Sequence, residues 1–342
     1  MAGSGSRRPV AMAQVARAAG VSVTTVSHVV NRTRSVAPET ERAVLAAIAE
    51  TGYVPDSIVR SQRTVGTRTV GLALSAMSNM YFADLVHSIE QTLAAAGYSM
   101  LLADTHDEVV DELRVVSDLL TRRVDAILLA PSADPRRALG HARKQGVPVV
   151  LIDRTASAHV DQVVAESKEA TASLVDHLVS RGHSRIAMIS GKPGLSTTEE
   201  RIQGYREGLK RNGLRFSSAL MVSGNSTDEG AQLAFAELLK LPVRPSALVV
   251  GNNVMTLGVM RAARRAGITV PGDLALVGYD DFPWADLFRP GLTVVAQPTE
   301  AMGREAAQMV LARLADSAHP VRRVVMRTTF VHRESCGCPL DS

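Results

Sequence analysis

Eight apolar runs separated by helix-length segments occupy residues 69–298, and this alternation constrains the fold more than any other feature. The runs are 69–75, 98–104, 125–131, 147–153, 185–190, 247–252, 274–280 and 292–298. Strands this apolar belong to parallel sheets that helices cover on both faces. Segments with helical periodicity lie between the runs, at 82–96, 111–121, 170–181, 201–211, 228–239 and 255–266. Because eight strands exceed one compact layer, we expect two similar α/β subdomains that divide near residue 164.

Ahead of this region, residues 14–31 (QVARAAGVSVTTVSHVVN) predict two short helices around a tight turn. Gly20 supplies the left-handed backbone that ends the first helix, and Ser22 is placed to cap the second. The second helix has a valine face, and most of its other side chains are small, polar and directed outward. A helix with one apolar face toward the protein and a polar outer face suits a DNA major groove. This is the helix-turn-helix pattern, with the second helix as the reader.

A third helix is expected at 38–50, where Val44, Leu45 and Ile48 form the apolar face. Charge is concentrated in the same part of the chain. Residues 1–64 hold eight arginines and four acidic residues, whereas the remainder holds 30 basic and 30 acidic residues. The whole formal excess of +4 therefore lies with the predicted DNA reader, as phosphate binding requires.

The two cysteines, Cys336 and Cys338, lie near the C-terminus. A disulfide between two cysteines separated by one residue cannot cross-link distant parts of a large fold. No neighbouring residues in the sequence complete a metal site. We therefore expect reduced thiols in a tail at 336–342, with no metal and no cofactor. The N-terminus has no apolar segment of a signal peptide, and no run reaches membrane-spanning length. These features predict a cytoplasmic, nucleoid-associated protein without a membrane partner.

Enzyme and transport functions are disfavoured by what the sequence lacks. No GxGxxG follows the first strand, and residues 191–198 (GKPGLSTT) lack the spacing of a phosphate-binding loop. We therefore expect no catalytic residues. A transport binding protein would share a two-lobed core, but it would need a signal peptide and would not carry residues 12–50.

The block VARAAGVSVTTVSHVVN and a series of later blocks resemble the lactose/galactose-repressor family of bacterial transcription regulators. In order, the later blocks are GYVPDSIVRSQRT, SNMYFADLVHSIE, RRVDAILLAP, PVVLIDR, HLVSRGHSRIAMISG, ERIQGYREGL, VPGDLALVGYDD and LTVVAQP. The resemblance implies an all-α helix-turn-helix headpiece (10–54), a hinge helix and linker (55–68) and a two-lobed α/β core like that of periplasmic binding proteins (69–335). It implies parallel sheets and three crossovers, with an N-lobe of 69–164 and 294–322 and a C-lobe of 165–293 and 323–335.

The same resemblance implies a repressor that works as a homodimer on a pseudo-palindromic double-stranded DNA operator. A small-molecule effector (a sugar, a sugar derivative or a small anion) bound between the lobes would control operator affinity. Whether the effector induces or co-represses stays open.

Val23 and Thr24 become the base-edge candidates, and His28 stands where many relatives carry arginine. Phosphate-contacting positions map to Ser22, Thr25, Ser27, Asn31, Arg32 and Arg34. In the hinge, Gln62 replaces a leucine that wedges into the minor groove in relatives. Either the operator is less bent, or Ile58 and Arg60 rearrange to compensate.

Effector-binding positions map to Ser78, Tyr81, Phe82, Arg154, Arg201, Asn253 and Asp280. Taken alone, Arg201 could equally pair with Glu200 at the surface, and Phe82 could be core. Trp284 is expected to pack near the cleft mouth. Three acidic positions of sugar-responsive relatives are replaced here, by Ala76, Ala165 and Asn253. This predicts a less acidic cleft, suited to an anionic or less hydroxylated ligand, or to none.

Overall fold

The computed structural model describes residues 12–31, 34, 36–51, 66–75, 79–157 and 159–338. The chain divides into two compact units, residues 1–67 and residues 68–342. In the described ranges, no helix is long and apolar enough to cross a membrane. Of the expected hinge helix and linker (55–68), residues 55–65 lie outside the described residues.

The first unit contains three helices, α1 (Met12–Ala18), α2 (Val23–Asn31) and α3 (Pro38–Thr51). Gly20 has φ +66°, and the Ser22 Oγ accepts a hydrogen bond from the Thr25 amide at 3.1 Å, so the predicted turn and cap are confirmed. A small core joins the helices; its members are Val15, Ala16, Val26, Val29, Val44 and Ala47.

The prediction that Leu45 belongs to this core is wrong, because its side chain is 53% exposed. Leu45 lies about 100° around the helix from Val44, and the face centred on Val44 and Ala47 is the one that packs against α1 and α2.

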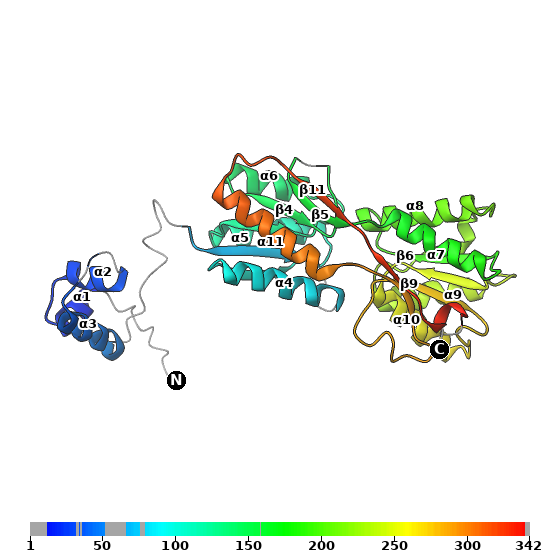
Figure 1. Cartoon of the computed structure of the whole chain (residues 1–342), viewed down its shortest axis with the longest axis horizontal. Helices are drawn as coiled ribbons and strands as arrows, with labels where there is room; N and C mark the ends of the chain where they lie inside the picture. The colour runs from blue at the N-terminus through cyan, green and yellow to red at the C-terminus, as the bar shows by residue number, and fades with distance from the viewer. Residues whose placement is uncertain are drawn as a thin grey trace, which may run out of the picture. The chain divides into compact units, whose positions relative to one another are not determined.

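The second unit has two lobes, each built on a six-stranded sheet (Figure 1). The N-lobe sheet is entirely parallel and has the order β11-β5-β4-β3-β1-β2. Its strands are β1 (Thr69–Leu74), β2 (Ser99–Asp104), β3 (Ala126–Leu129), β4 (Val149–Ile152), β5 (Asp161–Ala165) and β11 (Arg323–Met326). Helices α4 (Tyr81–Ala95) and α11 (Thr299–Ala315) cover one face, and α5 (Val109–Thr121) and α6 (Arg136–Lys144) cover the other.

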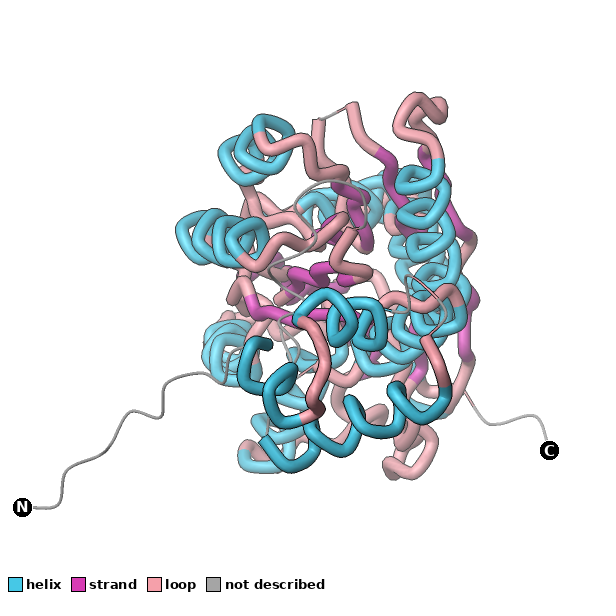
Figure 2. The backbone as a smooth tube through the Cα atoms, turned by 90° about the vertical axis from the view of Figure 1, so that its left-hand side faces the viewer, coloured by secondary structure: helices cyan, strands magenta, loops and turns pink. Residues whose placement is uncertain are grey.

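The C-lobe sheet has the order β12-β10-β9-β8-β6-β7, with only β12 antiparallel to its neighbour. Its strands are β6 (Ile186–Ser190), β7 (Met221–Ser223), β8 (Ala247–Val250), β9 (Ala275–Tyr279), β10 (Thr293–Ala296) and β12 (Thr329–Val331). Helices α7 (Lys168–Ser180) and α8 (Ser196–Arg211) pack on one face, and α9 (Asp228–Leu239) and α10 (Asn253–Arg265) on the other. Figure 2 shows helices on both sides of the strands, as the apolar runs predict.

The described chain crosses between the sheets three times, after β5, β10 and β11. Three of the predicted lobe boundaries need correction. Ala165 is the last residue of β5 and pairs with Met326 in the N-lobe sheet, so the N-lobe extends one residue beyond 164. β10 pairs with β9 in the C-lobe sheet, so residues 294–296 do not belong to the N-lobe. β11 pairs with β5 in the N-lobe sheet, so residues 323–326 do not belong to the C-lobe. The last crossover is the red segment that leaves β11 in Figure 1.

The predicted C-terminal tail is also partly wrong. Residues 334–336 form a short 3-10 helix, η2 (Glu334–Cys336), and the Cys336 side chain is fully buried in the C-lobe core. The Ser335 Oγ explains this placement, because it donates to the Leu276 carbonyl at 2.6 Å and accepts from the Thr293 amide at 2.8 Å. These bonds hold the segment against β9 and β10. Residues 339–342 lie outside the described part of the chain.

Candidate functional site

A cavity of about 690 Å³ lies between the two lobes. Residues that follow the carboxyl ends of strands in both sheets line it, among them Ser75, Asp153, Gly191, Gly251 and Asp280. In open parallel sheets, ligands bind outside these strand ends because the connecting loops converge there. The fold therefore brings segments distant in sequence to one polar cleft.

Each lobe has an aspartate in a left-handed backbone conformation directly after its fourth strand in chain order, and the N-lobe adds a second, Asp107, with φ +56°. Asp153 follows β4 with φ +69°, and Asp280 follows β9 with φ +71°. Both side chains are buried, at 5% and 3% exposure. Such a conformation is disfavoured for a residue with a side chain, and it clusters at ligand sites. The two positions are equivalent in the two lobes and mark the centre of the site.

Tyr81, at the start of α4, donates its hydroxyl hydrogen to Asp153 Oδ1 at 2.7 Å. Burial raises the pKa of this phenol well above its ordinary value, and the charges of Asp153 and Asp280 raise it further. The hydroxyl therefore keeps its proton and orients the Asp153 carboxylate. The ring of Phe82 meets the Tyr81 ring edge-on at 4.9 Å, so Phe82 is at once buried and part of the cavity wall.

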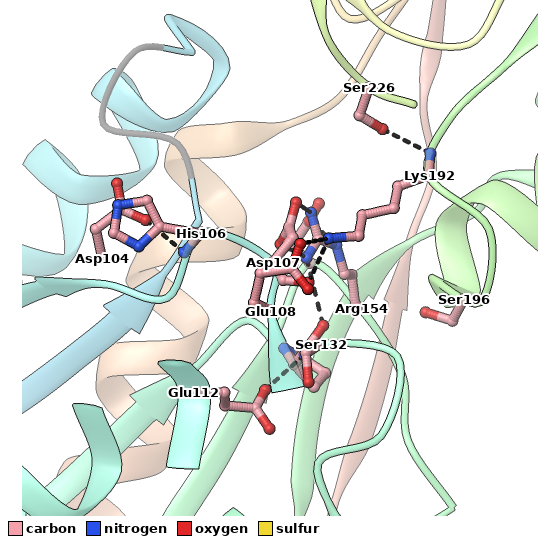
Figure 3. A network of polar contacts seen from close by, with 12 residues as sticks. Asp104, His106, Asp107, Glu108, Glu112, Ser132, Arg154, Lys192, Ser196 and Ser226 are labelled. Carbon is pink, nitrogen blue, oxygen red and sulfur yellow. Dashed lines mark hydrogen bonds and ion pairs between the residues drawn. The ribbon is translucent and has the colours of Figure 1, made fainter. Parts of the chain in front are cut away.

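Arg154 is buried and is paired with two carboxylates, one of which, Asp107, is labelled in Figure 3. Its guanidinium makes a two-pronged hydrogen bond to Asp107, and its Nε lies 3.4 Å from Asp153 Oδ2. Burial lowers the pKa of Arg154, but Asp107 and Asp153 outweigh that effect and the net shift is upward. The positive charge is thus fixed and already compensated within the protein.

Arg201, in α8, is a buried arginine that the C-lobe contributes to the cavity. Its guanidinium donates to the Gly251 carbonyl, lies 3.6 Å above the centre of the Tyr279 ring and is 3.8 Å from Asp280 Oδ1. These contacts exclude a surface pair with Glu200 as the role of Arg201. Burial raises the pKa of Asp280, against Arg201 and a 2.6 Å hydrogen bond from Gln297, which lower it.

A lysine after β6 connects the two lobes across the cleft (Figure 3). Lys192 Nζ donates to the Asp107 carbonyl at 2.9 Å and to Glu108 Oε1 at 2.6 Å, both in the N-lobe. A second cross-lobe bond runs from the Thr155 amide to the Ser196 Oγ at 2.9 Å. Lys192 belongs to the GKPGLSTT segment, so that segment serves lobe contact in this structure.

Among the predicted effector residues, five line the cavity: Tyr81, Phe82, Arg154, Arg201 and Asp280. Asn253 does not, because its Oδ1 turns back to the Val254 amide at 2.8 Å. Its neighbour Asn252 lines the cavity instead and caps α10 through the Met255 amide. Trp284 packs edge-on against Phe282 and is outside the lining. Ser78 lies outside the described residues.

The prediction of a cleft less acidic than in sugar-responsive relatives stays a prediction, but the cleft is not basic. The described lining contains six carboxylates against four lysine and arginine side chains, with acids at Asp104, Asp107, Glu108, Asp153, Asp228 and Asp280. Sequence reasoning missed Asp107, Asp153, Lys192 and Gln297. Asp153 directly follows an apolar run, so its position at the carboxyl end of a parallel strand was the available signal.

Glu112, in the first turn of α5, is a fully buried carboxylate next to this network (Figure 3). Its Oε2 accepts from the Ser132 amide at 2.6 Å, while its Oε1 has no hydrogen-bond partner in the described structure. Burial raises the pKa of Glu112 above its usual 4.5, against the hydrogen bonds from Ser132 and the charge of Arg154, which lower it. The folded protein therefore binds a proton at Glu112 more tightly than the unfolded chain does.

We expect Glu112→Gln to stabilise the protein at neutral pH by on the order of 1 kcal/mol, because it removes a poorly satisfied buried charge. In the wild type, the contribution of Glu112 to the free energy of unfolding falls as pH rises above about 4.5. The variant lacks this fall, so its advantage should grow from pH 4.5 to neutrality. Urea unfolding of both proteins across this range measures it; an advantage independent of pH would contradict the assignment.

In the first unit, the amino end of α2 presents Ser22, Val23 and Thr24 to solvent, with Val23 47% exposed. Arg34 is exposed as well, and the half-buried positions on this helix are Thr25, Ser27 and His28. The predicted residues Arg32, Arg60 and Gln62, and the side chain of Asn31, lie outside what the structure describes. The exposed, polar amino end of α2 is the part of a helix-turn-helix that reaches base edges.

Residues 11–56 match the model described as bacterial regulatory proteins, lacI family, and residues 175–336 match the periplasmic binding protein-like domain. The HTH-type transcriptional repressor PurR of Photobacterium profundum is 32% identical over 323 residues, which cover 94% of this chain and 97% of that protein. The chain belongs to the lacI family of bacterial regulatory proteins. PurR of Vibrio atlanticus is 33% identical over 328 residues, with 94% and 97% covered.

Solved lacI-family structures show the same architecture. The transcriptional regulator CelR–cellobiose complex is 32% identical, with a TM-score of 0.74 over 96% of this chain and 100% of that one. The lac repressor dimer bound to operator and the anti-inducer ONPF is 25% identical, with a TM-score of 0.80 over 96% and 99%. The predicted family, fold class and repressor function are thereby confirmed. The family consists of transcription regulators and not of enzymes.

Proposed function

We propose that this lacI-family repressor is a cytoplasmic, nucleoid-associated homodimer whose operator affinity is controlled by a neutral, polyhydroxylated small molecule bound between the lobes. The operator is a pseudo-palindrome, because a twofold dimer presents two equal readers to the DNA. The effector contacts Tyr81, Phe82, Arg154, Arg201 and Asp280, together with Asp153, Asn252 and Gln297. Lobe closure over it shifts the repressor between two states, typically by about 1–3 kcal/mol of coupling.

One observation carries the choice of a neutral effector: each described lysine or arginine that lines the cavity already has a carboxylate partner. The pairs are Arg154 with Asp107 and Asp153, Lys192 with Glu108, Arg201 with Asp280, and Arg261 with Asp228. An anion would have to displace these carboxylates or lie beside them. Hydroxyl groups instead donate to carboxylate oxygens and accept from arginine without breaking the pairs.

Titration calorimetry with matched ligands tests this choice. Each neutral mono- or disaccharide is compared with its own phosphate ester, so that only the charge differs. We expect at least one neutral sugar to bind, and its phosphate to bind at least about tenfold more weakly. Tighter binding of the phosphorylated member would overturn the neutral-effector proposal, while leaving the repressor function intact.

The DNA-reading surface is Ser22, Val23, Thr24, Thr25, Ser27, His28, Asn31, Arg32 and Arg34, with Arg60 and Gln62 in the hinge. Thr24 reads base edges because it is exposed at the amino end of α2, and Arg34 contributes charge toward phosphate. In this assignment the two residues have separable effects.

We expect Thr24→Val to weaken binding to the operator by about 1 kcal/mol or more, roughly five- to tenfold, and to leave non-specific DNA binding unchanged. Arg34→Gln should instead weaken both and lower the salt dependence of binding by about one phosphate contact. Fluorescence anisotropy on operator and scrambled DNA at several salt concentrations separates the two effects. If Thr24→Val weakened both DNAs equally, Thr24 would not be a base reader.

A further inference from the structure

Four side chains of the types that bind zinc meet on the C-lobe, and none of them lines the cleft described above. They are His177 in the last turn of α7, His332 just after β12, Cys336 at the end of η2, and Cys338. Each offers one ligand atom, and these four atoms all lie within 4.8 Å of one another. The cluster cannot be recognised from residue spacing, because His177 is more than 150 residues from the other three in the sequence.

Two sulfur–nitrogen separations within the cluster are close to those of a tetrahedral zinc site. Cys336 Sγ lies 3.3 Å from His332 Nε2, and Cys338 Sγ lies 3.8 Å from His177 Nε2. With Zn–S bonds of about 2.3 Å and Zn–N bonds of about 2.0–2.1 Å, tetrahedral angles place sulfur and nitrogen about 3.5 Å apart. The observed distances fall on either side of this value. An ion at the centre would draw together ligand atoms that are already at most 4.8 Å apart.

The backbone that carries the sulfurs is held in place by contacts outside the cluster. The carbonyl of Gly337, between the two cysteines, accepts from Arg181 Nη2 at 3.3 Å. Gly337 has φ +86°, which allows the chain to reverse between the two sulfurs. The Ser335 bonds to β9 and β10 fix the other side. The ligands therefore come from a preorganised segment, which reduces the entropy lost on metal binding.

We propose that His177, His332, Cys336 and Cys338 bind one zinc ion in a closed Cys2His2 site. Four protein ligands leave no open position, so the site is structural and not catalytic. On binding, both thiols release their protons to solvent and the two imidazoles bind as neutral ligands. The ion ties the C-terminal segment to the end of α7, whose terminal carbonyls favour a positive charge.

The test uses the full-length, reduced protein with any affinity tag removed, since polyhistidine binds metals. We expect about one zinc per chain by elemental analysis. After zinc removal, Co(II) should give the visible absorption of a tetrahedral site and a near-ultraviolet thiolate-to-cobalt band. Cys338→Ser replaces a half-buried ligand and His332→Gln replaces an exposed one. Both variants keep the buried Cys336. Both should lose bound zinc and the tetrahedral spectrum.

His159→Gln, an exposed histidine in the N-lobe, is the matched control and should keep the full zinc content and spectrum. Zinc removal should lower the melting temperature of the wild type and of His159→Gln, but not that of the two ligand variants. The proposal is overturned if the reduced wild type takes up no zinc. It is overturned equally if Cys338→Ser and His332→Gln hold as much as the wild type, which would indicate adventitious binding. A Cys336–Cys338 disulfide that resists reduction and excludes zinc would also overturn it.

Discussion

Asp280→Asn is expected to abolish the response of this repressor to its effector while leaving the fold and DNA binding intact. Asp280 is the C-lobe carboxylate of the cleft, and hydrogen bonds to a charged acceptor contribute about 1.5–3 kcal/mol each. The loss should weaken effector binding about 100-fold. Calorimetry with the sugar identified in the matched-ligand experiment measures this loss.

The fold should tolerate this change for three reasons. Asparagine is, after glycine, among the residues best suited to the left-handed backbone of position 280. Its side-chain oxygen can still accept from Gln297, and Arg201 keeps the Gly251 carbonyl and the Tyr279 ring. Burial raises the pKa of Asp280, so loss of the charge also removes a desolvation cost. Asp286→Asn, at an exposed position in the same lobe, is the control; equal effector affinity in both variants would exclude Asp280 from the site.

Gly204→Ala is expected to destabilise the C-lobe severely. Gly204 lies in α8, where the helix packs against α7 too closely for a side chain. A Cβ at this position would overlap the Lys168 carbonyl oxygen and lie 2.9 Å from the Thr171 Cβ. Overpacking against rigid backbone costs about 3 kcal/mol, against a gain of only about 1 kcal/mol in helix propensity. Arg201 is one turn away on the same helix, so effector binding should fall as well.

Urea unfolding followed by the fluorescence of Trp284, the only tryptophan, reports on this lobe directly. Gly140→Ala is the matched control, because a Cβ at this position in α6 meets no atom within 4 Å. That variant should be unchanged or stabilised by up to about 1 kcal/mol. A Gly204→Ala midpoint equal to that of the wild type would show that α7 and α8 separate without cost.

The alternation of apolar runs and helical segments was sufficient to predict both parallel sheets, because strands buried on two faces have a distinctive composition. Several elements escaped prediction, namely β5, β7, β11, β12, α6 and α11, and two of them show why. β11 (Arg323–Met326) is a half-exposed edge strand, and α6 (Arg136–Lys144) carries five basic side chains and few apolar ones. The lobe boundaries were displaced for a different reason. The apolar sequence of β10 is compatible with a buried strand in either lobe. Only its pairing with β9 shows that it belongs to the C-lobe sheet.

In the cleft, sequence comparison located Arg154 and Arg201 but not what neutralises them. Arg154 is paired with Asp107, a residue 47 positions away whose turn gives no sequence signal beyond following a strand. Without that pair, two arginines and three replaced acids suggested an anion site. The pairing of both arginines with carboxylates on other loops instead favours the neutral effector proposed above. The cysteine–histidine cluster escaped for the same reason, since its fourth member lies on α7.

A ligand in the interlobe cleft is expected to change the DNA affinity of this lacI-family repressor. The most direct measurement is anisotropy on the genomic DNA fragment that the protein itself selects, with and without the sugar identified by calorimetry. We predict a pseudo-palindromic site whose dissociation constant changes about 5- to 150-fold with the sugar for the wild type and not for Asp280→Asn. Operator affinity that does not change with saturating sugar in the wild type would contradict the account.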